Sequence, residues 1–385
     1  MMQRWHDGAR WRTESCNSHT SWLETAENTS SSTSTTIRSL RLSSLLCLGA
    51  SLRSRAFTAP RRMSSKRAFA SSSKNDDVID LTNDDDEKPA LKRRTRSRGS
   101  KSKLSATTEL SIATYNIWFG TTGHEDERME AIVETLAPHA PHLIGLQEVT
   151  PRLAQMLCPL LESLNYHTIL QPFGSYGCGV ACKVDKVVQS GYHPFSNSKM
   201  DRGIVWALVE KDGREILFTT THLESYLDSS STGGPEREAQ LVEMTEFCER
   251  CLRERSSTDM AIITGDLNWD DERARSEGHN RKLMSLISSS KWIDTYRQVE
   301  PTAQGYTYDP KENPMLGGGS LRRRFDRILV QKRGDDKAHV TSVEIVGKEA
   351  LPGISYVIPP TRFRGPQKRP VAPSDHFGLV TKLEF

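Results

Sequence analysis

The feature that most constrains the fold is a repeated pairing of a short apolar segment with a group of chemically active polar side chains. It occurs six times between residues 110 and 380. The polar residues are Asn116, Glu148, His222, Asp266 with Asn268, Asp326, and Asp375 with His376. A single Asp or Asn at a strand end is most often a turn residue or a cap. Six such groups, containing carboxylates, amides and imidazoles, indicate that strand ends converge on one site, as they commonly do in α/β folds.

The remaining pattern from about residue 108 to 385 alternates between strand-like and helix-like segments. Met129, Ile132, Val133 and Leu136 have the i, i+3, i+4, i+7 spacing of one helix face. The sequence predicts further helices over 153–161 and 235–255, the latter opened by a proline at a favourable first-turn position. It predicts strands over 110–115, 142–146, 216–221, 260–263, 325–330 and 377–380. This alternation predicts an α/β domain over 108–385.

Length, hydropathy and cysteine usage exclude several classes. No apolar run among the 385 residues is longer than about six, whereas a transmembrane helix needs about 20. We therefore expect no membrane partner. Seven scattered cysteines do not form a disulfide pattern and indicate a reducing compartment. Cys248 and Cys251 have a metal-like spacing, but Cys178 and Cys182 form a poor second pair. We expect buried, reduced thiols.

The first 105 residues differ in charge from the rest. Residues 1–105 carry a net charge of +9 and the remainder carries −6. Nothing in 1–105 can bury a core, which predicts a disordered, basic, Ser-rich tail. Residues 28–75 are rich in Arg and Ser and lack acids, as in an organelle transit peptide. Alternatively, Met63 is the true start and the upstream segment is an over-extension.

Two further tail segments suggest interactions. Within residues 77–87, the apolar stretch Val78–Leu81 is flanked by acids and resembles a SUMO-interacting motif, which adds a strand to an exposed sheet edge. The alternative is a solvated acidic linker. Residues 88–103 form a basic cluster of the nuclear-import or phosphate-binding type. We expect a nuclear protein, with a mitochondrion or another organelle as the alternative.

The chemistry of the polar groups favours a hard divalent cation. Carboxylates without a Cys cluster suit Mg²⁺, which takes oxygen ligands. Amides and imidazoles around such an ion can hold phosphate oxygens. The sequence has neither a phosphate-binding Gly-x-x-x-x-Gly-Lys-Ser/Thr loop nor a Gly-x-Ser-x-Gly elbow. Metal-assisted hydrolysis of a phosphodiester fits best.

The ordered motifs resemble those of the endonuclease/exonuclease/phosphatase superfamily. They are Thr114-Tyr-Asn116, Leu146-Gln-Glu148-Val, Thr221-His222-Leu-Glu-Ser225, Gly265-Asp266-Leu-Asn268, Arg324-Phe-Asp326-Arg and Ser374-Asp375-His376. The resemblance covers 114–376 and implies a four-layered α/β sandwich, in which two packed mixed β-sheets are flanked by helices as in deoxyribonuclease I. Within the superfamily the motifs most resemble those of the branch that hydrolyses 5′-phosphotyrosyl bonds in DNA.

The resemblance implies a role for each matching residue. Glu148 would be the principal Mg²⁺ ligand, with Asp375 beside it and Mn²⁺ as an alternative ion. Asp266 would orient or deprotonate the attacking water, and Asp326 would fix an imidazole. The residues implied to hold the phosphate are Asn116, His222, Ser225, Asn268 and His376.

Substrate contacts are implied around this centre. Tyr308 occupies the place of a family Trp that guides the DNA 5′ end, and Leu316 matches a leucine of a hydrophobic wall. Trp118 is a candidate for base stacking, and Arg324, within the cluster Arg322–Arg324, is a candidate DNA contact. Vertebrate relatives have Arg where this chain has Asp270, so the DNA contacts are expected to differ there.

The implied activity is Mg²⁺-dependent hydrolysis of DNA bearing a 5′-linked tyrosine or peptide, by a monomer. This is the removal of covalent topoisomerase II remnants, a DNA-repair reaction. An alternative keeps the fold and metal but changes the substrate, as in an abasic-site endonuclease, an RNA-directed nuclease, or a phosphoinositide or sphingomyelin phosphodiesterase. A further alternative is a non-enzymatic SUMO-binding adaptor, which the intact polar groups disfavour.

Overall fold

The structure is a computed structural model. It describes residues 109–172, 174–225, 233–270, 284–285, 287–288, 292–334, 338–360, 362 and 364–384. The expectations for the tail 1–105, including the targeting signal, the 77–87 segment and the 88–103 cluster, lie outside the described residues. Within the described part, no helix has both the length and the apolar character needed to cross a membrane.

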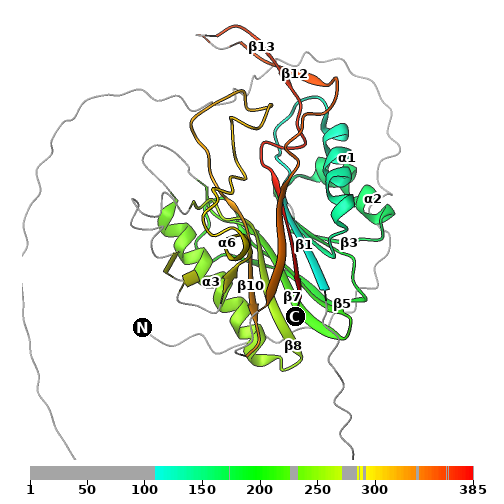
Figure 1. Ribbon diagram of the computed structural model, residues 1–385, viewed down its shortest axis with the longest axis vertical. Helices are drawn as coiled ribbons and strands as arrows, with labels where there is room; N and C mark the ends of the chain where they lie inside the picture. The colour runs from blue at the N-terminus through cyan, green and yellow to red at the C-terminus, as the bar shows by residue number, and fades with distance from the viewer. Residues whose placement is uncertain are drawn as a thin grey trace, which may run out of the picture. The chain divides into compact units, whose positions relative to one another are not determined.

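Two six-stranded sheets form the centre of the folded body (Figure 1). The first has the order β11-β14-β1-β2-β4-β3, and the second has the order β5-β6-β7-β8-β10-β9. The strands of the first sheet are β1 (Glu109–Asn116), β2 (Leu143–Val149), β3 (His167–Leu170), β4 (Gly177–Cys182), β11 (His339–Val346) and β14 (Gly378–Glu384). Those of the second are β5 (Lys186–Pro194), β6 (Gly203–Lys211), β7 (Arg214–His222), β8 (Thr258–Asp266), β9 (Ile293–Asp294) and β10 (Asp326–Lys332).

Each sheet is mixed, with one parallel pair at its centre. β1 pairs with β2 and β7 pairs with β8 in parallel, while the other pairings are antiparallel. A parallel pair needs a crossover, which is usually a helix. The crossovers are α1 (Glu125–Leu136), followed by the short 3-10 helix η1 (Ala137–His139), and α3 (Gly234–Glu254). Two further helices whose bounds lie within the described residues are α2 (Pro151–Ser163) and α6 (Thr295–Val299).

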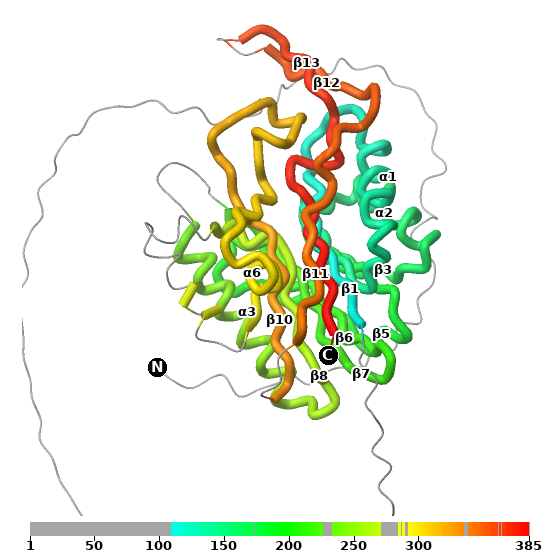
Figure 2. Tube along the Cα trace, in the orientation of Figure 1, coloured from blue at the N-terminus to red at the C-terminus, as the bar shows by residue number. Residues whose placement is uncertain are grey.

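Helices cover the outer faces of the two packed sheets, as the trace in Figure 2 also shows. One core lies between the sheets and contains Ile112 of β1 and Phe218 of β7. A second joins α3 to the second sheet through Met244 and Leu241, and a third joins α1 and α2 to the first sheet. The four-layered sandwich expected from the sequence is confirmed.

The central strands are nearly continuously apolar because both of their faces are buried. In β8, Met260 and Ile262 face the core between the sheets, while Ala261 and Ile263 face α3. Toward the end of the strands, the layer between the sheets becomes polar. Gln147 Nε2 donates to Thr220 Oγ1 of the opposite sheet at 2.8 Å. This change from apolar to polar marks the end of the sandwich at which the candidate site lies.

Four of the five described cysteines, Cys178, Cys182, Cys248 and Cys251, are buried as expected, whereas Cys158 is half-buried; all five are free. Burial raises the pKa of the Cys182 thiol to about 12, so it stays protonated and is a poor metal ligand.

Candidate active site

The candidate site lies where strands of both sheets begin or end. β1, β7 and β8 finish on Asn116, His222 and Asp266, and Glu148 is the penultimate residue of β2. β10 runs antiparallel to β8, so its first residue, Asp326, is paired with Asp266. The segment Asp375-His376 directly precedes β14, which is antiparallel to β1. Strand direction therefore explains why six groups that are distant in sequence meet at one end of the sheets.

Asn116 joins the two sheets at this point. Its Nδ2 donates to Glu148 Oε1 of its own sheet at 3.2 Å and to Asp266 Oδ2 of the other sheet at 3.0 Å. The backbone N–H of Asn268 donates to Asp266 Oδ1 at 2.8 Å. Asp266 is thus held by donors on both oxygens although it is almost fully buried. A buried carboxylate fixed in this way keeps one orientation.

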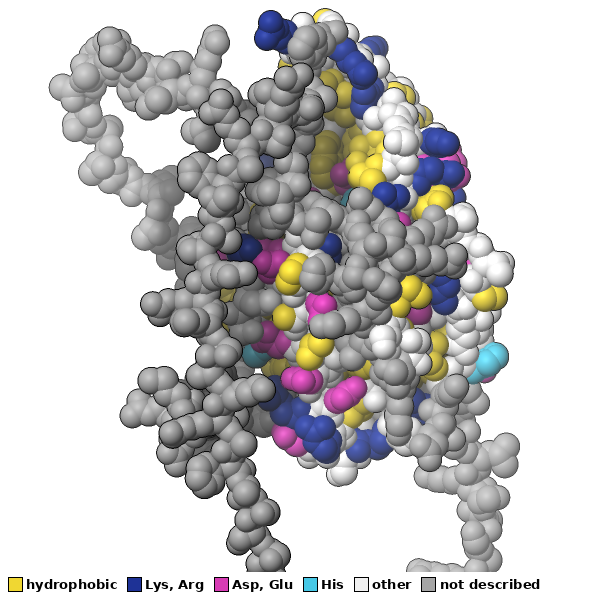
Figure 3. All heavy atoms as spheres, turned by 90° about the vertical axis from the view of Figure 1, so that its left-hand side faces the viewer, with side chains coloured by type: hydrophobic (Ala, Val, Ile, Leu, Met, Phe, Trp, Pro, Cys, Tyr) yellow, Lys and Arg dark blue, Asp and Glu magenta, His cyan; other side chains and the backbone are white. Residues whose placement is uncertain are grey.

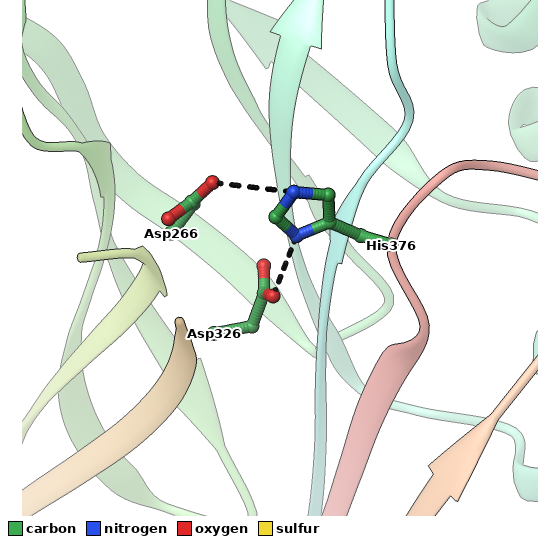
Figure 4. Close-up of side chains that lie close together, drawn as sticks. All are labelled: Asp266, Asp326 and His376. Atoms are coloured by element: carbon green, nitrogen blue, oxygen red, sulfur yellow. Dashed lines mark hydrogen bonds and ion pairs between the residues drawn. The ribbon is translucent and has the colours of Figure 1, made fainter. Parts of the chain in front are cut away.

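Asp266 and Asp326 both face the imidazole of His376, one at each ring nitrogen (Figure 4). His376 Nδ1 lies 2.8 Å from Asp326 Oδ2, and its Nε2 lies 3.8 Å from Asp266 Oδ2. Burial opposes protonation of the His376 ring, but the Asp326 carboxylate outweighs it and raises the His376 pKa well above the usual value. Asp326 therefore contacts the imidazole of His376 and favours its cationic form.

The second histidine of the site is neutral. His222 Nε2 lies 3.4 Å from Asp266 Oδ2. Burial, followed by the charge of Arg202, lowers the His222 pKa to about 3. Its Nδ1 has no hydrogen-bond partner among the described residues. One polar atom of this buried ring is therefore available to a ligand.

Glu148 and Asp375 are the residues whose chemistry best fits a divalent cation. Burial, followed by the charge of Asp375, raises the Glu148 pKa to about 7, and the Asp375 pKa is raised by its enclosure. Two neighbouring carboxylates that disfavour each other's charge are stabilised by a bound cation. The side chains of Asp266, Asp326 and His376 also lie within 4.8 Å of one another. The protonated His376, hydrogen-bonded to Asp326, is however a poor metal ligand.

Local backbone geometry orients Glu148. The pairing of β2 with β4 is irregular between Leu146 and Val149, and Glu148 has a left-handed φ of 60°. Such irregularities re-aim a side chain and are common at functional sites. The backbone N–H of Phe119 donates to Glu148 Oε2 at 3.1 Å. The loop after β1 therefore completes the orientation of this carboxylate.

Arg128, which was not among the residues predicted from the sequence, holds that loop. Its guanidinium is fully buried and donates to the carbonyls of Gly120, Trp118, Ile117 and Pro373 at 2.9, 2.9, 2.5 and 3.1 Å. It also lies 4.8 Å from the centre of the Trp118 ring. Arg128 shares the apolar stripe of α1 with Ile132 and Leu136. The sequence did contain a signal for this residue, because Arg128 is a charged residue on a helix face that is otherwise predicted to be apolar.

Three of the five predicted substrate residues lie at or near the site surface. Tyr308 is half-buried, and its ring meets that of His376 edge-on at 5.3 Å. Trp118 is half-buried, and its backbone N–H donates to Asn116 Oδ1 at 3.0 Å. Leu316 is half-buried at the end of the turn that begins at Asn313. Ser225, predicted to hold phosphate, has its Oγ 3.3 Å from Met200 Sδ.

The expectation that Arg324 contacts DNA is wrong. Its side chain is about 2% exposed and lies 2.9 Å from Asp294 Oδ2, which also pairs with Arg327. Its neighbours are also paired, Arg322 with Asp309 and Arg323 with Asp270. The residue that fixes Arg324 lies 30 positions earlier on β9, so local sequence gave no indication of its burial.

Comparison with known proteins identifies the class. The model of the Endonuclease/Exonuclease/phosphatase family matches residues 113–376, and the chain belongs to this family. It is a hydrolase of phosphoester bonds. Tyrosyl-DNA phosphodiesterase 2 of Rattus norvegicus is 27% identical over 318 residues, which are 81% of this chain and 76% of that protein. The Homo sapiens protein of the same name is 26% identical over 282 residues, covering 71% and 68%.

A solved structure shares the fold. The crystal structure of D. rerio TDP2 complexed with single strand DNA product superposes with a TM-score of 0.56 at 21% identity, covering 72% of this chain and 99% of that one. At this identity the likeness concerns the fold. The protein is a member of the endonuclease/exonuclease/phosphatase family with sequence similarity to tyrosyl-DNA phosphodiesterase 2.

Proposed function

We propose that the protein is a Mg²⁺-dependent 5′-tyrosyl-DNA phosphodiesterase that acts in the nucleus in DNA repair. The observation that carries the proposal is the position of Asp266, which lies between a neutral and a cationic imidazole and shares Asn116 with Glu148. The matches to curated tyrosyl-DNA phosphodiesterases support the choice of substrate.

The chemistry of the leaving group suits this site. A tyrosyl phosphodiester leaves as a phenolate, whose conjugate acid has a pKa of about 10. Such a group needs little help from a general acid. The protein therefore has two tasks, which are to activate a water molecule and to compensate the charge that develops on phosphorus-bound oxygens.

The residues divide these tasks. Asp266, fixed by Asn116 and Asn268, accepts a proton from the attacking water. His376, kept cationic by Asp326, donates through Nε2 to a phosphate oxygen. His222, kept neutral by its burial, lies with Nε2 3.4 Å from Asp266 Oδ2 and helps to orient that carboxylate. The carboxylate of Asp266 lies beside the side chain that would donate a hydrogen bond to the phosphate. The base and the substrate are therefore within reach of each other.

Glu148 and Asp375 would hold the divalent cation. When bound there, the cation supplies positive charge to the phosphoryl and leaving oxygens. Mg²⁺ suits the oxygen ligands, and Mn²⁺ is the alternative. The protein's own contribution is to orient both carboxylates, Glu148 through Asn116 and Phe119 and Asp375 through its place beside Ser374.

The site surface suits a DNA end. Tyr308 packs against His376 and presents an aromatic ring beside the phosphate position, where an end base can stack. Trp118 and Leu316 extend this surface. The Val78–Leu81 segment of the tail is proposed to bind SUMO and thereby recruit the enzyme.

A paired substrate assay tests the proposal. The protein is incubated with Mg²⁺ and either a 5′-phosphotyrosyl oligonucleotide or an oligonucleotide containing an abasic site. We expect release of tyrosine and a 5′-phosphate from the first, and no cleavage of the second. Cleavage of the abasic oligonucleotide alone would identify the other branch of the family.

A further inference from the structure

A small basic hairpin stands apart from the two large sheets. β12 (Ser355–Ile358) pairs antiparallel with β13 (Gln367–Pro370), and Figure 1 shows the pair extending beyond the end of the body at which the site lies. We call β12, β13 and the described residues between them the basic hairpin. Its cations are Arg362, Arg364, Lys368 and Arg369. Only four residues separate Pro370 from Asp375, so the hairpin leads directly into the site.

The net charge of the hairpin is opposite in sign to that of the rest of the body. Residues 350–374 contain four Lys or Arg and no Asp or Glu, whereas residues 106–385 as a whole carry −6. The rest of the body therefore carries −10 and repels a polyanion. Arg362, Arg364 and Lys368 are exposed. In Figure 3, dark-blue Lys and Arg side chains lie at the upper end of the body, where β12 and β13 lie in Figure 1, and others lie among magenta side chains at its lower end.

The base of the hairpin is fixed relative to the site. Arg369 Nη1 donates to the carbonyl of Leu316 at 2.6 Å, and the Tyr356 hydroxyl donates to the carbonyl of Met315 at 3.2 Å. The same turn is tied to the site, because Asn313 Nδ2 donates to the Ser374 carbonyl at 2.8 Å. Arg369 thus anchors the hairpin, and Arg362, Arg364 and Lys368 expose their side chains to solvent.

We propose that the basic hairpin binds the phosphate backbone of the DNA strand whose 5′ end occupies the site. This inference rests on the proposed function, because it takes the substrate to be a nucleic acid. Lys368 is seven residues from Asp375, a reach of at most about 25 Å, which corresponds to about seven nucleotides of a B-form strand. The contacts are to phosphates, so they add affinity without sequence preference.

The test compares two triple variants with equal loss of charge. The first is Arg362→Ala with Arg364→Ala and Lys368→Ala, which leaves the anchoring Arg369 in place. The control is Lys186→Ala with Arg250→Ala and Arg253→Ala. These residues are exposed, and they lie toward the opposite end of the second sheet, where β5 and β8 begin. The substrates are 5′-phosphotyrosyl oligonucleotides of three and twelve nucleotides and the p-nitrophenyl ester of thymidine 5′-monophosphate.

The hairpin variant should bind the 12-mer about tenfold more weakly than the control. The slope of log Kd against log salt should fall in magnitude by about 2, since each lost phosphate contact contributes about 0.7. Turnover of the 3-mer and of the nitrophenyl ester should be unchanged. Equal affinity and salt slope in the two variants would overturn the inference, as would an equal loss on the ester and the 12-mer.

Failure of the proposed function gives a different result. If the wild type binds the 12-mer through the hairpin but releases no tyrosine, the substrate assignment is wrong and the binding surface stands.

Discussion

Asp266 is the side chain at which the two sheets and both histidines meet. Its oxygens accept hydrogen bonds from Asn116 Nδ2 and the Asn268 N–H, and they lie 3.4 and 3.8 Å from His222 and His376. Because these contacts come from four different segments, the role of Asp266 depends on its negative charge in a fixed position. Its packing could be preserved by an isosteric amide.

Replacing that charge gives the first prediction. Asp266→Asn should lower kcat on a 5′-phosphotyrosyl oligonucleotide by about 10³-fold, the typical scale of a lost general base, with little change in melting temperature. The matched control is Asp259→Asn, at the other end of β8. A variant Asp266→Asn with near wild-type kcat would remove Asp266 from the chemistry.

His142 gives a prediction about stability and pH. Its Nδ1 accepts a hydrogen bond from the Ser111 N–H at 3.0 Å, which requires an unprotonated nitrogen. Burial, followed by the charge of Lys211, lowers the His142 pKa. The unfolded chain takes up the proton below about pH 6.5 while the folded protein resists it, so this contribution to stability is lost as pH falls.

The measurement is urea unfolding of the wild type and His142→Gln at pH 7.5 and 5.5. The wild type should lose more stability between these pH values than the variant does. His167→Gln, at the exposed start of β3, serves as the control and should behave as the wild type. An equal loss in His142→Gln and the wild type would contradict the assignment.

At the scale of elements, α1 supports the site through one residue. Arg128 connects the helix to the loop that follows β1 and to Pro373, just before Asp375. Arg128 therefore holds the backbone just before Asp375 and the loop whose Phe119 N–H orients the Glu148 side chain. A planar group with several donors suits this task, and a lysine cannot replace it.

We expect Arg128→Lys to lower kcat by at least about tenfold and to destabilise the fold by about 1–3 kcal/mol, because buried carbonyls lose their donors. The apparent affinity for the divalent cation should fall as well. Glu130→Ala, on the exposed face of the same helix, should change neither value. The readouts are Mg²⁺ titration of activity and thermal unfolding, and unchanged Mg²⁺ dependence in Arg128→Lys would contradict this role.

The elements also show what the sequence could predict. The central strands and the polar residues at their ends were predicted because burial on both faces leaves a continuous apolar run, as in Ile262-Ile263 of β8. The basic hairpin was not, since Tyr356 and Arg369 are positioned by the turn at Met315 and Leu316, far away in sequence. Arg324 was assigned to DNA because its partner Asp294 becomes close only in the folded chain.

At the scale of the whole molecule, the distance between the sheets determines whether the site is complete. Gly145 lies in β2 against the second sheet, and a Cβ atom built there would lie 2.3 Å from Thr264 Oγ1 and 2.7 Å from Thr220 Oγ1. The hydrogen bond between Asn116 and Asp266 connects the two sheets nearby. A small outward shift of one sheet would therefore separate these two side chains.

Gly145→Ala should therefore cost about 1–3 kcal/mol of stability and lower kcat, because an overpacked position forces the backbone to move. Gly174→Ala is the control, since a Cβ atom there meets nothing within 4 Å. The two variants are compared by urea unfolding and by steady-state kinetics. A fully stable and active Gly145→Ala would show that the sheets are not closely packed at this point.

The central claim is that side chains from both sheets act on one phosphate in one chemical step. It is tested most directly by single-turnover hydrolysis of a 5′-phosphotyrosyl oligonucleotide in Mg²⁺ by Glu148→Gln, Asp266→Asn and the double variant. Residues that act as a unit are strongly non-additive, so we expect each single variant to lose at least about 10³-fold and the double variant to be no slower than the worse single one. Losses that multiply in the double variant, or a single variant that cleaves at the wild-type rate, would contradict a shared site.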